Sequence, residues 1–270
     1  MKRSENLSDR IKIFEEDLAD MVEEKHKQFA IKMIEQLPDY FFEVPASSTG
    51  KYHPRVSLGS GGLVRHTKFA VKIARDLLNL EYNQTAFSPT ERDAIICGLI
   101  LHDGFKHGLA DKDNGFTSAD HPIVVSNFIN GQTVEEDLQE FQKLLVRVTA
   151  SHMGQWNTDF KSKKEILPKP SDNVEMFVHM CDYIASRRYL DIDFDGNPYD
   201  PTNYNTSRLK TEIDKLINLC KSKVAEGYDR LALYDIIAEL NNGNKNPNSI
   251  TDIEVVNNIT AKISELNHEK

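Results

Sequence analysis

Apolar residues recur every three or four positions over most of this 270-residue chain. Over residues 7–37, Ile11, Phe14 and Leu18 repeat at this spacing with charged residues between them. The spacing places apolar side chains on one face of an α-helix. Further segments with the same pattern cover residues 63–80, 88–102, 121–128, 138–152 and 174–185. No segment shows sustained alternation of apolar and polar residues, the pattern of strands. The sequence therefore predicts an all-α fold.

One predicted helix ends in two ionisable residues. It begins at "SPTE", residues 88–91, which has the form of a capping box with proline at the first helical position. Its apolar run over residues 95–101 passes directly into His102 and Asp103, and Lys106 follows. Ionisable side chains at the end of a buried helix need partners. We expect other inward-facing residues to supply them.

Six ligand-type residues lie on apolar faces or at ends of the predicted helices: His66, His102, Asp103, His121, His152 and Asp182. One histidine of this kind is ordinarily a core residue with a satisfied hydrogen bond, but burying several together without partners would be costly. Imidazoles and carboxylates inside a helical bundle suit a divalent metal ion, and this mixed set fits zinc, iron or manganese better than calcium. Six donors are too many for a closed structural zinc site and suffice for two metal ions that share a carboxylate.

The order of four of these residues resembles a known family. His66, the doublet His102-Asp103 and Asp182 are similar to the H…HD…D signature of the HD-domain metal-dependent phosphohydrolases. The segment "GGLVRHT", residues 61–67, resembles the "GGLLEHT" opening of HD domains in certain bacterial 3′→5′ exoribonucleases. The resemblance covers roughly residues 51–190. It implies an HD-domain helical bundle with additional N- and C-terminal helices.

Two further histidines resemble those of the binuclear branch of this family: His121 in "ADHPIVVSNFI" and His152 in "TASHMGQW". Lys106 lies where many members carry lysine, in the pattern HDxxK. Phe105 replaces the glycine that binuclear relatives commonly show, and no "GYP" is present. These two departures are not typical of the cyclic-di-GMP phosphodiesterase branch.

The resemblance implies a role for each ligand-type residue. The first metal ion would be held by His66, His102, Asp103 and Asp182, with Asp103 bridging to the second. His121 and His152 would complete the second. The expected cofactors are two divalent metal ions, drawn from manganese, iron, zinc and magnesium.

Several residues near these ligands are candidates for substrate contacts. Lys106 is expected to act in catalysis and to bind phosphate, the alternative being a solvated surface lysine. Arg187 or Arg188, about one turn after Asp182, is expected to point toward the pocket. Trp156 is a candidate for stacking on a base, whereas His107 is expected to be an exposed loop histidine.

A loop and a basic stretch flank the predicted site. Lys51, His53 and Arg55 precede the glycines of "GSGG", and either grip phosphate or give the loop ordinary polarity. The stretch "FKSKKEILPKP", residues 160–170, either binds a polyphosphate or nucleic-acid backbone or forms a solvated face.

The chain divides into three predicted parts. Residues 1–50 form an N-terminal helical segment, 51–191 the metal-binding core, and 192–270 a linker with C-terminal helices that pack on the core. The linker "DIDFDGNPYDPTNYN" is read as a surface loop, because it lacks the glutamate of a calcium-binding EF-hand loop. The C-terminal helices either cap the pocket, form a dimer surface or bind a partner.

Composition narrows the functional classes. A formal net charge of −9 argues against broad binding to long nucleic acid. Cys97, Cys181 and Cys220 are expected to be free thiols in a reducing cytoplasm, and neither a signal peptide nor a membrane-spanning run is visible.

The predicted function is hydrolysis of a phosphoester bond of a nucleotide or similar small molecule by a metal-activated water. The alternatives are a 3′→5′ nuclease acting on short single-stranded nucleic acid, a cyclic-nucleotide phosphodiesterase, and a di-iron oxygenase of the same family.

Overall fold

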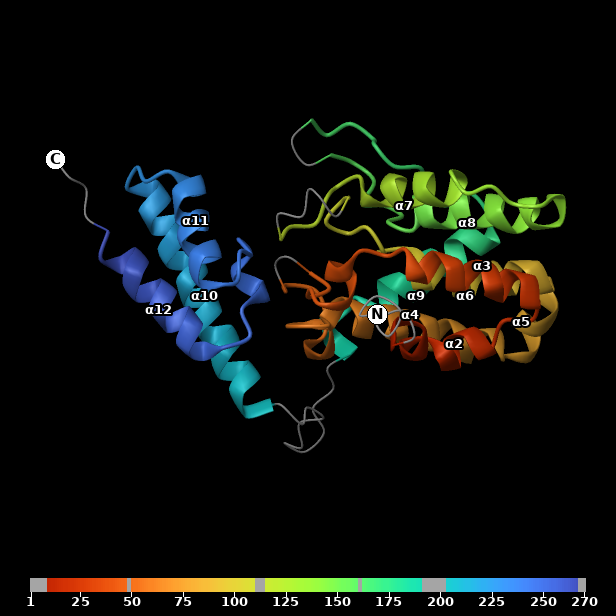
Figure 1. The fold of residues 1–270 in the computed structure, drawn as a ribbon, viewed down its shortest axis with the longest axis horizontal. Coiled ribbons are helices and arrows are strands. Elements are labelled where there is room, and N and C mark those ends of the chain that lie inside the picture. The colour runs from red at the N-terminus through yellow and green to blue at the C-terminus, as the bar shows by residue number, and fades with distance from the viewer. Residues whose placement is uncertain (1–8, 48–49, 110–114, 160–161, 191–202, 267–270) are drawn as a thin grey trace, which may run out of the picture.

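A computed structural model describes residues 9–47, 50–109, 115–159, 162–190 and 203–266 (Figure 1). These residues form helices and connecting loops, with one isolated β-bridge between Thr158 and Glu165 and no sheet. The predicted all-α fold is confirmed. After a helical turn at residues 9–13, the α-helices are α2 (Glu15–Ala19), α3 (Glu24–Glu35), α4 (Gly62–Leu78), α5 (Glu81–Ala86), α6 (Pro89–Leu101), α7 (His121–Asn130), α8 (Gln139–Ser151), α9 (Asn173–Ala185), α10 (Asn203–Ala225), α11 (Arg230–Leu240) and α12 (Ile253–Ser264).

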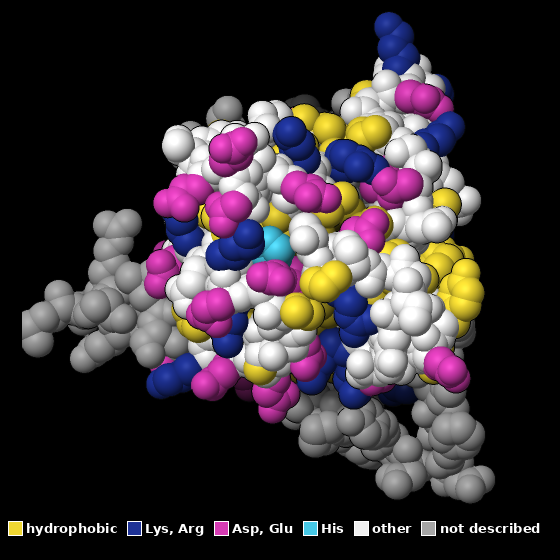
Figure 2. All heavy atoms as spheres, turned by 90° about the vertical axis from the view of Figure 1, so that its right-hand side faces the viewer, with side chains coloured by type: hydrophobic (Ala, Val, Ile, Leu, Met, Phe, Trp, Pro, Cys, Tyr) yellow, Lys and Arg dark blue, Asp and Glu magenta, His cyan; other side chains and the backbone are white. Residues whose placement is uncertain are grey.

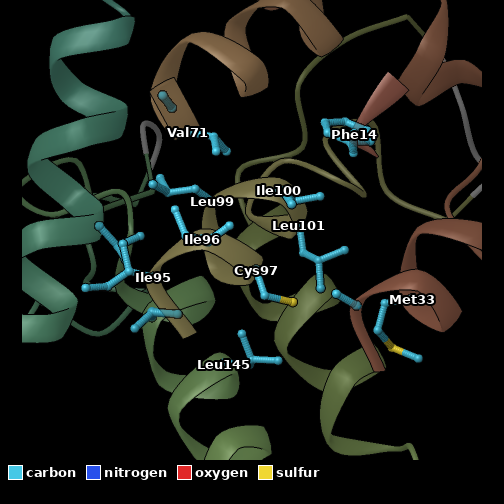
Figure 3. Packing of buried hydrophobic residues seen from close by; sticks show 14 of the residues in the cluster. Phe14, Met33, Val71, Ile95, Ile96, Cys97, Leu99, Ile100, Leu101 and Leu145 are labelled. Atoms are coloured by element: carbon cyan, nitrogen blue, oxygen red, sulfur yellow. The ribbon is translucent and has the colours of Figure 1, made fainter. Parts of the chain in front are cut away.

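Helix α6 is the centre of the bundle, with α2, α3, α4, α8 and α9 packed around it. Every residue from Asp93 to His102 is buried, which explains why the run over residues 95–101 is apolar on all sides. Figure 3 shows its side chains among Phe14, Met33 and Leu145 from three other elements. Gly98 permits close contact with α8, because a Cβ there would lie 2.6 Å from Val148 Cγ2.

The predicted start of α6 is also confirmed. The Ser88 hydroxyl accepts a hydrogen bond from the Glu91 backbone N–H at 3.3 Å, and the Glu91 carboxylate accepts one from the Ser88 N–H at 2.8 Å. This capping box satisfies backbone donors at the helix start. In Figure 1, α6 begins near α5 and runs toward the side where α10, α11 and α12 lie, so its C-terminal end faces that side.

The N-terminal segment differs from the single helix expected over residues 7–37, of which 7 and 8 lie outside the described residues. The helix is interrupted between α2 and α3. There the buried carboxylate of Asp93 on α6 accepts hydrogen bonds from the backbone N–H groups of Val22 at 2.6 Å and Glu23 at 2.9 Å. His26 Nδ1 lies 2.8 Å from the same carboxylate. A contact distant in sequence therefore sets the start of α3.

The described residues contain two hydrophobic cores. The larger core combines apolar residues between Phe14 and Ala46 with those of α4 to α9, so the N-terminal segment shares the core of the metal-binding part. Helices α10, α11 and α12 enclose a second core, which includes Leu216, Ile237 and Ile259. The predicted linker falls on residues 191–202, outside the described residues, and on the first turn of α10.

The end of the bundle at α5 carries a mixed charge. Figure 2 looks at this end and shows Lys and Arg side chains interspersed with Asp and Glu. Among the helices described here, none has the length and apolar character needed to cross a membrane.

The Asp93 carboxylate is expected to stabilise the fold by linking the N-terminal segment to α6. Asp93→Ala removes the acceptor of three donors, so we expect the free energy of unfolding to fall by about 2–4 kcal/mol, measured by urea denaturation. Asp76→Ala is the control, since this exposed aspartate pairs with Lys72 at 3.8 Å and its loss should change the free energy by less than about 0.5 kcal/mol. Equal midpoints for the two variants would contradict the linking role.

Candidate metal centre

The six ligand-type residues converge at the C-terminal end of α6, and we call them the His–Asp cluster: His66, His102, Asp103, His121, His152 and Asp182. His66 and Asp182 lie in the interior of helices, on α4 and α9. His121 is the first residue of α7, and the other three follow the ends of α6 and α8. The structure therefore brings all of them together, mostly by helix ends rather than by helix faces.

Three of the imidazoles are oriented by their own backbone. His102, His121 and His152 each have Nδ1 at 2.6, 2.7 and 2.7 Å, respectively, from the carbonyl oxygen three residues earlier. A carbonyl only accepts, so Nδ1 carries the proton and donates it. When such a ring is neutral, the lone pair of Nε2 points into the cluster, which is how metal-binding histidines are commonly held.

The Asp103 carboxylate divides the cluster into two groups of donors. Its Oδ1 lies 3.0 Å from His121 Nε2 and 3.9 Å from His152 Nε2. Its Oδ2 lies 3.4 Å from His102 Nε2 and 3.7 Å from His66 Nε2. Each oxygen atom therefore faces a different pair of imidazoles, the arrangement expected of a carboxylate that bridges two cations.

Asp182 belongs to one of these groups. Its Oδ1 lies 3.0 Å from His66 Nε2 and 3.4 Å from His102 Nε2. The Nε2 atoms of both histidines are nevertheless buried without a hydrogen-bond partner among the described residues. Buried polar atoms are rarely left unpaired, and a divalent cation would satisfy both nitrogens. The donors in the cluster therefore fit a metal ion.

The electrostatics of the cluster keep its carboxylates charged. Burial alone would raise the pKa of Asp103, but Lys106 and His102 hold it well below its usual range. The pKa of Asp182 is likewise held low, against burial, by His102 and His66. Burial also opposes a charge on His102, yet the two carboxylates raise its pKa to about 10. In the absence of a cation, protonated His102 partly balances the two negative charges.

Lys106 lies inside the site. Its side chain is buried, and Nζ lies 2.5 Å from Asp103 Oδ2. The alternative of a solvated surface lysine is therefore wrong. The expectation of an exposed His107 is also wrong, because this residue is buried and its ring stacks on Tyr40 with centroids 5.1 Å apart. The turn after α6 is packed against the bundle, which explains both differences.

Arg187 packs against two aromatic side chains. Its guanidinium lies 4.1 Å from the centroid of the Tyr183 ring and 5.6 Å from that of Trp156. The neighbouring Arg188 is exposed. Arg187 therefore contacts these rings from the segment that follows α9, the helix that carries Asp182.

The loop before α4 brings His53 to the cluster. Its ring centroid lies 5.0 Å from that of His66. Burial, then the nearby His66 and Lys106, lower the pKa of His53 to about 2. Lys51 and Arg55 of the same loop are exposed. The position of His53 ahead of the "GSGG" segment was the only sequence signal for it, and helical periodicity does not apply to a loop.

No protein-family model, curated protein or solved structure matches this chain. The function of the site must therefore be inferred from its geometry and chemistry.

The buried imidazoles predict a stability maximum near pH 6.5 for the metal-free protein. Burial lowers the pKa of His53 to about 2 and that of His152 to about 3. Below pH 6.5 the unfolded chain therefore binds protons that the folded chain does not, and the folded state loses stability. His102 changes the stability in the opposite direction, because its pKa is raised. Protonated His102 stabilises the fold fully below pH 6.5, and this contribution is lost as the pH rises toward about 10.

Urea denaturation of chelator-treated protein at a series of pH values measures this dependence. Between pH 6.5 and 4.5, His53→Gln should reduce the loss of unfolding free energy by an amount on the order of 2 kcal/mol. Identical profiles for the parent and the variant would show that His53 does not resist protonation in the folded state.

Proposed function

We propose that this protein is a metal-dependent phosphohydrolase of the HD type, which binds two divalent metal ions and cleaves a phosphoester bond of a nucleotide or similar small molecule. The observation that carries the proposal is the position of Asp103, whose two carboxylate oxygens each lie within 3.9 Å of a different pair of imidazole Nε2 atoms. A site for a single metal ion would not require the four imidazoles to be divided between the two oxygens of Asp103.

The donor set supports two neighbouring cations. His66, His102 and Asp182 would hold one with Oδ2 of Asp103, and His121 and His152 would hold the other with Oδ1. Divalent ions in such a pair supply an activated water at neutral pH and offset negative charge on a phosphoryl group. The imidazoles and carboxylates of the chain orient and retain the ions, and the low pKa of both aspartates keeps their oxygens ionised.

Lys106 supports a phosphorylated substrate in particular. A buried ammonium group beside the shared carboxylate adds positive charge where phosphate oxygens would lie, and it is a hydrogen-bond donor for the leaving oxygen. This placement favours hydrolysis over the di-iron oxygenase alternative. The net charge of −9 disfavours long nucleic acid as the substrate.

Metal content tests the division of the cluster. We expect about two metal ions per chain in protein purified without chelator, about one in His121→Ala and fewer in Asp103→Ala, because His121 faces one oxygen of Asp103 whereas Asp103 serves both groups. Elemental analysis of the folded fraction measures this. Asp76→Ala, which removes an exposed carboxylate from α4, should retain two. One ion per chain in both the parent and His121→Ala would sink the two-metal proposal.

Hydrolysis tests the reaction. The metal-loaded parent should release nitrophenol from bis(p-nitrophenyl) phosphate, and Asp103→Ala should be slower by at least about 100-fold, since it removes a charged group at the reacting centre. Asp76→Ala should match the parent. Two irons per chain without release of nitrophenol or phosphate from any compound in a nucleotide panel would favour the oxygenase alternative instead.

Lys106→Ala should separate metal binding from catalysis. Because Lys106 is a cation and not a ligand, its removal should leave the metal content at two and lower kcat by roughly 100-fold. Lys106→Arg, which keeps the charge, should lose less. An unchanged kcat in Lys106→Ala would refute a role for this residue in the reaction.

A further inference from the structure

Solvent reaches the His–Asp cluster from the side of Asp182. The Asp182 side chain is 15% exposed, whereas none of the other five side chains of the cluster is more than 3% exposed. A substrate whose phosphate enters the cluster would therefore pass Asp182. The remainder of that substrate would then contact side chains near Asp182 on the surface.

Three side chains on and near α9, the helix that carries Asp182, form a stacked group, which we call the aromatic ledge: Trp156, Tyr183 and Arg187. The rings of Trp156 and Tyr183 are stacked, with centroids 5.5 Å apart and planes inclined by 13°. The Arg187 guanidinium lies 4.1 Å from the centroid of the Tyr183 ring. Tyr183 directly follows Asp182 on α9, so the ledge begins beside the exposed member of the cluster.

The ledge is tied to the cluster through His179. Its Nδ1 donates a hydrogen bond to the carbonyl oxygen of His152, a member of the cluster, at 2.7 Å. Gly154, at a φ of +58°, leaves room for this ring, since a Cβ there would lie 2.2 Å from His179 Cε1. Trp156 follows within the same turn, its backbone N–H bonded to the Met153 carbonyl at 3.1 Å. The indole of Trp156 therefore lies only four positions after His152, a ligand candidate.

The other side of Trp156 is anchored as well. The next residue, Asn157, is buried, and its side-chain amide donates to the Leu167 carbonyl at 3.1 Å. Arg187 is held in turn, because its Nε donates to the Tyr183 carbonyl at 3.0 Å and its Nη2 to Ser186 Oγ at 2.7 Å. A ligand that binds the ledge would meet side chains that are already ordered.

The indole of Trp156 is fixed but not covered. It remains 44% exposed although it is the largest aromatic side chain of the protein. A purely structural stack would gain more by burying this ring. An anchored, exposed aromatic ring is instead a surface on which a planar group stacks, and a nearby guanidinium adds attraction for an electron-rich ring or a phosphate.

We propose that the aromatic ledge binds the base of a mononucleotide, which stacks on Trp156 while the phosphoester enters the His–Asp cluster. This inference rests on the proposed function for the phosphate and adds a nucleobase to the substrate. Because the ledge offers one exposed indole, it accommodates one base rather than a run of bases.

Fluorescence of Trp156 tests the stacking directly, because the chain contains only one tryptophan. The metal-loaded protein is titrated with the 5′-phosphonate analogue of AMP, which cannot be hydrolysed, and with methylphosphonate as the base-free control. Free N-acetyltryptophanamide corrects for absorption by the base. We expect saturable quenching by the AMP analogue and none by methylphosphonate. Equal responses to the two compounds would overturn the inference.

Kinetics provide a second readout. Trp156→Leu should raise KM for AMP by about 5- to 100-fold, the range for loss of one base–aromatic stack, and leave KM for ribose 5-phosphate unchanged. Trp156→Phe, which keeps an aromatic ring, should lie closer to the parent. An equal rise in KM for both substrates in Trp156→Leu would indicate a distorted site and contradict a specific contact with the base.

The failure of this inference can be told apart from failure of the proposed function. Quenching by the AMP analogue without any phosphoester hydrolysis would support the ledge as a nucleobase site and refute the proposed phosphohydrolase function. Hydrolysis of bis(p-nitrophenyl) phosphate without base-dependent quenching would support the phosphohydrolase function and refute the nucleobase site. Quenching by a trinucleotide phosphonate at much lower concentration than by the AMP analogue would overturn the assignment of a mononucleotide.

Discussion

The negative charge of the Asp103 carboxylate, buried among four imidazoles, is the constraint on which the rest of this structure depends. Removing such a charge from water is costly unless it is paired and hydrogen-bonded. Here the carboxylate lies near nitrogen atoms of four histidines, at 3.0–3.9 Å, and 2.5 Å from Lys106 Nζ. The pKa of His152 is lowered to about 3, so this imidazole is neutral, and with its Nδ1 proton bonded to a backbone carbonyl it presents a lone pair that attracts a cation. Under the proposed function, divalent metal ions would be held between this carboxylate and the imidazoles.

This requirement explains the architecture around α6. A helix buried on all sides carries the His102-Asp103 doublet into the bundle, and the ends of α7 and α8 bring His121 and His152 against it. Helix ends suit this purpose because the chain turns there and lets an imidazole bond to the carbonyl three residues earlier. The cluster is partly open to solvent at Asp182, and the next residue, Tyr183, stacks on Trp156. The packing of the helices thus gathers the cluster at the end of α6, and α9 carries both Asp182 of the cluster and Tyr183, which stacks on Trp156.

Local patterns in the sequence were sufficient for some of these features. The 3.6-residue periodicity predicted the helices, the "SPTE" segment predicted the capping box of α6, and six ligand-type residues at inward positions predicted the cluster. Features that depend on contacts distant in sequence were not predictable. The break before α3 requires Asp93, more than seventy positions away from Val22. The contact of His53 with His66 and the burial of His107 follow from loops folding over the end of the bundle, for which no periodicity exists.

The most direct test of the account is the number and position of metal ions around Asp103. Crystals grown with Mn²⁺ and measured at a wavelength with anomalous scattering from manganese would locate each ion independently of the protein phases. The account predicts two peaks, roughly 3.5–4 Å apart, one facing each carboxylate oxygen of Asp103. A single peak shared by all six side chains, or peaks elsewhere in the chain with none at Asp103, would contradict it.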